Sequence, residues 1–297
     1  MIKRVLHFSN PYHLSFKNNQ LIITSKDTGE TKQAVIEDLG FLVLDNQQIT
    51  FTQSVMQALA ENNTAVVFCN KKHHPSSMLF HLDTNSVQSE IFTSQINTKE
   101  PLKKNLWKQI IERKIKNQAS IIKKIGKNEK PLLLFASQVK SGDTTNREAQ
   151  ASRYYWQNIF NTKNFKRERF GMPPNPQLNY GYSILRAAVA RALSGSGLLS
   201  TLGIHHHNKY NAFCLADDIM EPYRPFVDEC VLEIISKNAD YHIMDKNNKA
   251  ELLNLLNRDV KFEKFTRPLM IGISITTASL VKCFSGEEKK INYPILV

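Results

Sequence analysis

A change in the spacing of apolar residues divides this chain of 297 residues. Between residues 101 and 126 the apolar positions recur about every 3.6 residues, the period of an amphipathic helix. They are Leu106, Ile110, Ile111, Ile115, Ala119, Ile122 and Ile125. Residues 2–45 instead contain short runs of β-forming side chains separated by turn residues. The sequence therefore predicts an α+β protein, with a small β-rich domain before a larger helical one.

We expect a β-rich N-terminal domain over residues 1–80, a linker over 81–98 and an all-α C-terminal domain over 99–297. In the first part, the Asn-Asn pair inside "YHLSFKNNQLIIT" indicates a β-hairpin, and "NTAVVFCN" is typical of a buried strand. Polar composition without a clear period places the linker after residue 76. Beyond it, "LNYGYSILRAAVARALSGSG", "EPYRPFVDECVLEIIS" and "KAELLNLLNRD" favour further helices.

Several classes of protein are disfavoured by what the sequence contains. The first residues, "MIKRVLHFSNPYHLSF", lack the apolar core of a signal peptide, and no apolar run approaches the ~20 residues that span a bilayer. The four cysteines are scattered, without a C-x-x-C pair, which favours reduced thiols over disulfides. We therefore expect a cytoplasmic protein with no membrane partner.

The positive charge is concentrated in one segment. The formal net charge is +12; residues 99–170 hold 18 Lys and Arg against 6 Asp and Glu, whereas residues 1–98 hold 7 against 8. Such a distribution is typical of a nucleic-acid-binding face, although a solvated lysine-rich helix would look the same. The candidate DNA-binding residues in the helical stretch are Lys103, Lys104, Lys108, Lys116, Lys123 and Lys124.

Aromatic and basic side chains alternate at the end of this basic segment. Lys166, Arg167 and Arg169 follow "RYYWQNIF", an arrangement that can stack bases and neutralise phosphates. The competing interpretation is that Tyr155 and Trp156 belong to the core. The prolines in "FKRERFGMPPNPQ" predict an exposed loop.

An acidic cluster follows three histidines in "GIHHHNKYNAFCLADDIMEPYRP". In a helix, Asp218 and Glu221 lie three residues apart and share a face. A divalent cation would reconcile these acids with a basic chain, and oxygen ligands with one imidazole suit Mg²⁺ or Mn²⁺. The alternative is a surface acidic helix, with one acid paired to Arg224 and the histidines in an unrelated loop.

Glu148, in "SGDTTNREAQASRYYW", has two interpretations. The spacing of Thr145 and Glu148 matches a capping box, in which the glutamate only satisfies a backbone N–H at a helix start. A carboxylate inside the most basic stretch is also well placed to hold a metal ion against a phosphate.

Three of these segments together resemble a known family. "NREAQASRYYW", "LNYGYSILRAAVARAL" and "GIHHHNKYNAFCLADDIMEPYRPFVD", in that order after a β-rich domain, are similar to CRISPR-associated protein one, the integrase-nuclease of CRISPR adaptation. The short form found beside RNA-guided effector nucleases of type II systems is the variant resembled. The resemblance extends over essentially the whole chain.

The resemblance implies a metal-binding catalytic site made of a glutamate, a histidine and an acid. The glutamate of the family's "N-R-E" motif falls on Glu148, and the acids of the "D-x-M-E-P-[FY]-R-P" motif fall on Asp218 and Glu221. The family's histidine lies fourth in a glycine-led motif and twelve positions before the motif aspartate. Both counts give His206. The implied catalytic set is Glu148, His206 and Glu221, with Asp218 as a further direct or water-mediated metal ligand.

The resemblance also implies partners and a reaction. The partners are double-stranded DNA (protospacer and CRISPR repeat), a second copy of the chain, and a dimer of the second CRISPR adaptation protein; the RNA-guided effector nuclease is a further candidate. DNA 3′-hydroxyls attack phosphodiesters at the repeat ends, and Mg²⁺ or Mn²⁺ stabilises the developing charge. The nucleophile belongs to DNA, which agrees with the lack of a convincing Ser/His/Asp or Cys/His set.

Two alternatives stay open at this point. The same site could belong to a stand-alone metal-dependent nuclease that acts on branched DNA, with water replacing the 3′-hydroxyl. The acidic cluster could instead only cap helices in a non-catalytic DNA-binding scaffold.

Overall fold

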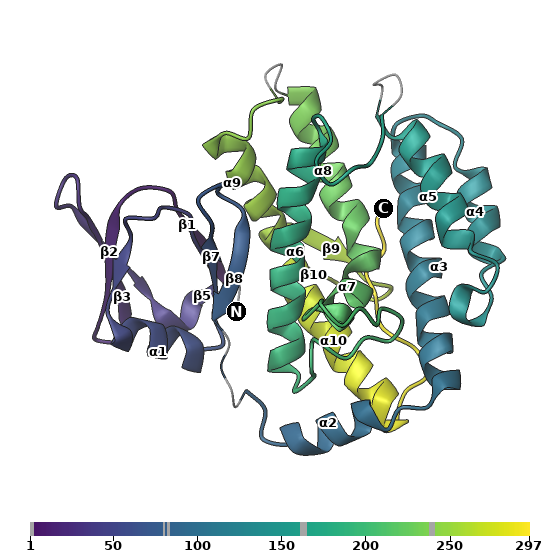
Figure 1. Ribbon diagram of the computed structural model, residues 1–297, viewed down its shortest axis with the longest axis horizontal. Coiled ribbons are helices and arrows are strands. Elements are labelled where there is room, and N and C mark those ends of the chain that lie inside the picture. Colours follow the sequence, from purple (N-terminus) through teal and green to yellow (C-terminus); the bar gives the residue numbers. More distant parts are fainter. Residues whose placement is uncertain (1–2, 80, 82–83, 161–164, 238–240) are drawn as a thin grey trace. The chain divides into compact units, whose positions relative to one another are not determined.

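The computed structural model describes residues 3–79, 81, 84–160, 165–237 and 241–297. The chain forms two units, Met1–Ser86 and Val87–Val297. The first is built mainly of strands and the second mainly of helices (Figure 1). The expected α+β class is confirmed.

The N-terminal unit contains two four-stranded sheets. Its strands are β1 (Arg4–Phe8), β2 (Tyr12–Lys17), β3 (Gln20–Ser25), β4 (Thr31–Val35), β5 (Leu39–Leu44), β6 (Thr50–Phe51), β7 (Ala65–Cys69) and β8 (Pro75–Leu79). One sheet has the order β1-β5-β7-β8, with β8 antiparallel to β7 and the other neighbours parallel. The other has the order β4-β3-β2-β6. The short helices of the unit are η1 (Ile36–Asp38) and α1 (Gln53–Glu61).

The local sequence signals in this unit agree with its structure. Asn18 and Asn19 have φ angles of 50° and 57°, which suit the tight turn between β2 and β3, so the predicted hairpin is confirmed. Strand β5 is buried along its whole length, as expected for a run of apolar residues between two parallel neighbours. Its side chains and those of β2, β3 and α1 form the core of the unit.

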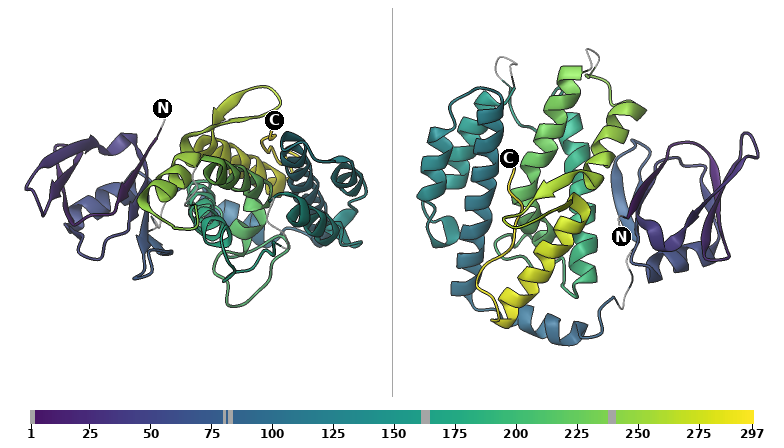
Figure 2. Two further views of the ribbon diagram at one scale, coloured as in Figure 1. Left: turned by 90° about the horizontal axis from the view of Figure 1, so that it is seen from above. Right: turned by 180° about the vertical axis from the view of Figure 1, so that it is seen from behind.

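The C-terminal unit is a group of packed helices. They are α2 (Gln88–Ile96), α3 (Glu100–Lys124), α4 (Lys130–Ser137), η2 (Ser141–Asp143), α5 (Arg147–Asn158), α6 (Asn175–Gly195), α7 (Cys214–Met220), η3 (Glu221–Tyr223), α8 (Arg224–Lys237), α9 (Lys246–Asn254), η4 (Leu255–Asn257) and α10 (Leu269–Ser285). Helix α3 packs against α4 and α5, and also against α7, η3 and α8 (Figures 1 and 2). This central place makes α3 the element on which the other parts of the site meet.

Part of the expected linker is folded. The boundary between the units falls after Ser86, and residues 88–96 of the linker expected over 81–98 form α2. Residues 82–83 lie outside the described residues. Ile91 is buried, and the Gln95 amide donates to the carbonyl groups of Leu199 and Leu202. These tertiary contacts stabilise a helix in a segment whose polar composition predicted none.

The helical unit also contains a small antiparallel sheet that was not expected. It consists of β9 (Asp259–Lys261) and β10 (Thr266–Pro268). The buried Asn117 of α3 holds the C-terminal segment, because its Oδ1 accepts a hydrogen bond from the N–H of Leu296. Its Nδ2 donates to the carbonyl of Pro222 in η3. None of the described helices is long and apolar enough to cross a bilayer.

Candidate active site

The centre of the site is a buried lysine on α3. The Nζ atom of Lys114 lies 2.5 Å from Glu148 Oε1 and 2.6 Å from Glu221 Oε2, and only 9% of the side chain is exposed. Burial lowers the pKa of Lys114, but the two carboxylates outweigh burial and raise that pKa above its ordinary value. The charged ammonium thus joins the two glutamates that the sequence nominated as ligands.

Glu148 enters the site from the first turn of α5. The backbone N–H groups of Arg147 and Glu148 donate to the carboxylate of Asp143 at 2.8 and 3.0 Å, so Asp143 caps this helix. The Oγ1 atom of Thr145, which a capping box would use, has no hydrogen-bond partner among the described residues. The capping-box interpretation is therefore wrong, and the Glu148 carboxylate is available for other contacts.

Glu221 lies where α7 passes into η3, just before Pro222. Its Oε1 accepts a hydrogen bond from Arg224 Nε at 2.7 Å. Burial raises the pKa of Glu221, but Arg224 and Lys114 outweigh it and lower the pKa to about 2. The alternative of a surface acidic helix predicted that one acid pairs with Arg224, and Glu221 does so. It is wrong about the surface, because every residue of α7 is buried.

Asp218 is enclosed by the histidine-bearing loop and has no exposed surface. Its Oδ2 accepts from the N–H groups of Ile204 and His205 at 2.6 and 2.9 Å. Its Oδ1 lies 2.5 Å from His206 Nδ1. Both oxygens are therefore engaged, in the arrangement by which a carboxylate orients a metal-binding histidine.

The loop needs a glycine at its start. A Cβ atom on Gly203 would lie 2.3 Å from the carbonyl oxygen of His206 and 2.9 Å from Asp218 Oδ2. Such contacts are closer than any side chain tolerates, so only glycine lets the loop close over the Asp218 carboxylate. This explains physically why a glycine leads the histidine motif.

The structure distinguishes the functions of His206 and its neighbours. The hydrogen bond with Asp218 raises the pKa of His206 above its ordinary value, and the Glu221 charge adds to this effect. Because Nδ1 faces Asp218, Nε2 is the nitrogen left for a ligand. His207 is exposed and, with His206, lines a pocket of about 380 Å³.

His205 has a packing role. Its ring stacks on the buried ring of Trp107 at a centroid distance of 4.1 Å and an interplanar angle of 5°. The rings of His206 and Trp107 are nearly perpendicular, with a centroid distance of 5.8 Å. Burial lowers the pKa of His205. Trp107, two turns before Lys114 on α3, therefore supports the loop that carries His206.

The residues present fit a divalent cation, although they are not arranged as a finished coordination sphere. Among the described residues, no three His, Cys, Asp or Glu side chains form a ready metal-binding group. The two glutamates converge on the Lys114 ammonium, and Nδ1 of His206 is turned to Asp218. Two carboxylates that meet at a buried positive charge, and an imidazole oriented by a third carboxylate, are donors of the kinds that Mg²⁺ and Mn²⁺ accept.

A second buried carboxylate near this cluster was missed by the sequence analysis. Asp228 accepts hydrogen bonds from the hydroxyl groups of Tyr155 and Tyr182. Burial raises the pKa of Asp228 to about 6, although these hydrogen bonds act in the opposite direction. The Arg224 guanidinium lies over the Tyr182 ring at 4.7 Å, so this network supports the arginine that holds Glu221.

Lys114 and Trp107 were also missed, although the helical period contained a signal for them. Lys114 lies four residues after Ile110 and three after Ile111, which places it on the apolar face of α3. A charged residue on that face needs a buried partner. Asp217, also in the acidic cluster, points elsewhere and pairs with Arg186 at 2.7 Å.

The candidate DNA-binding residues differ in their exposure and in their partners. Helix α3 has 25 residues and a length of about 37 Å. Lys104, Lys116 and Lys123 are exposed, whereas Lys103 pairs with Glu100, Lys108 with Glu112 and Lys124 with Glu229. Lys166 and Arg169 are exposed on the loop before α6.

Other candidate residues have local partners or line a separate groove. Arg167 donates to Asn175 and Asn179. Lys108 and Lys116 line a groove of about 440 Å³, together with Lys289 and Lys290 of the C-terminal segment.

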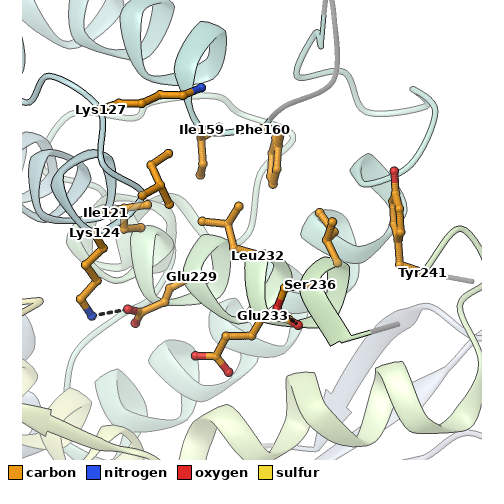
Figure 3. Close-up of a pocket in the computed structure, with 12 residues that line it drawn as sticks. Ile121, Lys124, Lys127, Ile159, Phe160, Glu229, Leu232, Glu233, Ser236 and Tyr241 are labelled. Atoms are coloured by element: carbon orange, nitrogen blue, oxygen red, sulfur yellow. Dashed lines mark hydrogen bonds and ion pairs between the residues drawn. The ribbon is translucent and has the colours of Figure 1, made fainter. Parts of the chain in front are cut away.

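A larger groove is lined by neither Glu148 nor Glu221. Its volume is about 740 Å³, and it is formed by the ends of α3 and α5 together with α8 (Figure 3). Ile121, Ile159, Phe160 and Leu232 line it, and the Lys124–Glu229 ion pair lies at its edge. Most of its exposed lining area is apolar, so its chemical character differs from that of the charged cluster around Lys114.

Comparison with known proteins identifies the family of this chain. The family model described as "CRISPR associated protein Cas1" matches residues 6–261. The chain belongs to the Cas1 family. The Neisseria meningitidis serogroup C protein named "CRISPR-associated endonuclease Cas1" is 35% identical over 266 residues, covering 89% of this chain and 86% of that protein.

Solved structures show the Cas1 fold more widely. A casposase bound to integration product superposes with a TM-score of 0.77 at 18% identity, covering 98% of this chain and 93% of that one. A chain of a Cas6-RT-Cas1–Cas2 complex gives a TM-score of 0.75 at 19% identity, covering 98% of this chain and 36% of that one. At these identities the likeness shows a shared fold.

Proposed function

We propose that this Cas1-family protein is a metal-dependent DNA endonuclease and strand transferase of CRISPR adaptation. It inserts short foreign DNA into the CRISPR array by attack of 3′-hydroxyl groups on phosphodiesters. The carrying observation is the convergence of Glu148 and Glu221 on one buried cation, beside a histidine oriented by Asp218. The endonuclease name of the Neisseria relative and the integration product bound to the casposase support this proposal.

Glu148, Glu221 and His206 Nε2 are the groups that would hold Mg²⁺ or Mn²⁺. When bound, such an ion stabilises the charge that develops on a phosphodiester during transesterification. The protein's own contribution is to position the ligands. Asp218 fixes the tautomer and orientation of His206, and Arg224 fixes Glu221. The attacking hydroxyl comes from DNA, so no protein nucleophile is required.

Exposed basic residues would hold the DNA backbone without reading its sequence. Lys104, Lys116, Lys123, Lys166 and Arg169 are exposed members of the candidate set that form no ion pair among the described residues. Lys103, Lys108 and Lys124 lie in ion pairs, which a phosphate would have to replace. We expect the exposed group to contribute more to binding.

The proposed assembly contains two copies of the chain and the second CRISPR adaptation protein. The Cas1–Cas2 complex among the structural neighbours supports the second partner. The RNA-guided effector nuclease stays a candidate from the type II resemblance. We place the reaction in the cytoplasm, where CRISPR arrays and invading DNA meet.

Strand transfer tests this function directly. Purified protein, the second adaptation protein, a short duplex with free 3′-hydroxyls and a plasmid carrying a CRISPR array are combined with Mg²⁺, Mn²⁺ or chelator. Joined products should appear only with a metal ion. Full activity in excess chelator would refute metal dependence. Cleavage of branched DNA without joining would favour the stand-alone nuclease, and DNA binding without either reaction would favour the scaffold.

A further inference from the structure

Lys114 occupies the place between the glutamates that the proposed metal ion would need. Its ammonium contacts both carboxylates at 2.5 and 2.6 Å. A divalent ion and an ammonium cannot share that space, because two cations at such separation repel strongly in a buried site. Binding of the ion therefore requires the ammonium to move.

The structure offers a place for the displaced ammonium. Glu221, Lys114 and Gln118 all line a pocket of about 150 Å³. Gln118 lies one helical turn after Lys114 and is 2% exposed. Its Oε1 atom has no hydrogen-bond partner among the described residues. A buried carbonyl oxygen in this state gains a charge-assisted hydrogen bond if an ammonium reaches it.

Other charged groups in the pocket determine which position the lysine prefers. Asp228, Arg167 and Arg224 also line it. The two guanidinium groups oppose entry of a third cation, whereas the carboxylate of Asp228 favours it. This balance, together with the ion pairs to Glu148 and Glu221, agrees with the observed place of the ammonium between these two glutamates.

Resting on the proposed function, we propose that Lys114 is an exchangeable counter-ion at the metal site. Without the metal ion, Lys114 neutralises Glu148 and Glu221 and keeps them together. When the ion binds, the ammonium moves to Gln118. Lys114 thus keeps the metal-free site folded and lowers its apparent affinity for the ion, because part of the binding free energy is used to displace the ammonium.

A double-mutant cycle on Mn²⁺ binding tests this proposal. Calorimetric titration is carried out on wild type, Lys114→Met, Gln118→Leu and the double variant, with Lys264→Met as an exposed control for the loss of one positive charge. Lys114→Met should bind Mn²⁺ about tenfold or more tightly than wild type. Gln118→Leu should bind it about tenfold more weakly, because the displaced ammonium loses its acceptor. In the Lys114→Met background, Gln118→Leu should have no effect.

Each other outcome overturns the inference. Equal binding by Lys114→Met would show that the lysine does not compete with the ion, and weaker binding would show that it assists the ligands. If Lys114→Met does not fold, Gln118→Leu still decides, since affinity equal to that of wild type contradicts the exchange. Wild type that binds no Mn²⁺ would refute both this inference and the metal-dependent function. Wild type that binds Mn²⁺ without coupling between Lys114 and Gln118 would refute the exchange alone.

Discussion

The carboxylate of Asp218 and the ring of His206 approach each other to 2.5 Å, and this pairing decides which nitrogen of the imidazole is left for a ligand. The same carboxylate receives backbone N–H groups from the loop around the ring. One buried acid therefore fixes both the path of the loop and the orientation of the histidine. Substitutions at these two residues should have different consequences.

Asp218→Ala should destabilise the protein, whereas His206→Ala should not. Loss of the carboxylate leaves buried N–H donors without an acceptor, which should lower the free energy of unfolding by roughly 2–4 kcal/mol. His206→Ala removes an exposed side chain and should abolish strand transfer with nearly wild-type stability. Urea unfolding and joining assays on both variants check this prediction. Equal stability of the two would contradict the structural role of Asp218.

Glu148→Ala should be the cleaner inactive variant. Glu148 is partly exposed and does not cap its helix, so its loss should cost about 1 kcal/mol or less, while strand transfer falls to background. Glu221→Ala should also be inactive, but it removes the carboxylate that pairs with Arg224 and leaves Lys114 with Glu148 alone in a buried site, which should cost about 3–5 kcal/mol. Thermal unfolding and DNA-binding measurements separate the two. Undiminished joining by Glu148→Ala would remove the support for the proposed site.

Asp143→Ala should loosen the start of α5. Two backbone N–H groups lose their cap, which should lower stability by about 1 kcal/mol and displace Glu148. Thr145→Ala is the matched control, because the Thr145 hydroxyl caps nothing. Strand transfer should fall for the first variant and stay unchanged for the second. A larger decrease in the Thr145 variant would restore the capping-box interpretation.

The free energy of unfolding should depend on Asp228 between about pH 4 and 6. Burial raises the pKa of Asp228 from 3.8 to about 6 in the folded chain, so the folded state binds the proton more tightly than the unfolded state. The contribution of this group is therefore most favourable below about pH 4 and declines as pH rises to about 6. The total change should be about 3 kcal/mol.

Asp228→Asn is the variant that tests this dependence. The charged and titratable groups around the carboxylate are Arg224, Arg167, Tyr155 and Tyr182. These groups are unchanged in the variant. The two proteins therefore differ only in whether residue 228 can bind or release a proton. The difference in unfolding free energy between wild type and Asp228→Asn should shift with pH over this range. A constant difference from pH 4.5 to 7 would contradict the prediction.

Charge reversal of the exposed lysines on α3 should weaken binding of a DNA duplex. Lys116→Glu combined with Lys123→Glu should reduce the log–log salt slope by about one unit for each phosphate that the protein no longer neutralises. Lys17→Glu, on an exposed strand position of the N-terminal unit, is the control. Fluorescence anisotropy across a salt titration measures both. If the double variant and wild type gave the same slope, α3 would have no role in DNA binding.

Local sequence signals were sufficient where short-range interactions decide the structure. The period of α3 and the Asn18–Asn19 turn both depend on residues close in the chain, and both were predicted correctly. The segment around Gln95 was predicted as linker from its polar composition. Its helix is held by Leu199 and Leu202, which lie about a hundred residues away in the sequence. A polar segment with distant partners gives no local signal for such a helix.

The site was predictable only in part for the same reason. Motif resemblance nominated Glu148, His206 and Glu221, and the structure brings both glutamates to one ammonium. Motif resemblance could not identify Lys114, because the motifs contain the acids and not the cation that pairs with them. At Glu148 the spacing to Thr145 suggested a cap, but Asp143 supplies it after a turn in which Gly142 has a φ of 72°. Such a turn is settled by backbone conformation, which the spacing does not record.

The ion pairs of Lys114 also bear on when the protein becomes active during its synthesis. They join α3 to side chains 34 and 107 positions further along, which makes the site a product of long-range contacts. Contacts of high sequence separation form late in folding, after the connecting segments are ordered. A partly made chain that ends before η3 therefore carries the basic residues of α3 without Glu221. Under the proposed function, cleavage therefore waits for the tertiary structure that brings Glu221 to Lys114 and Glu148.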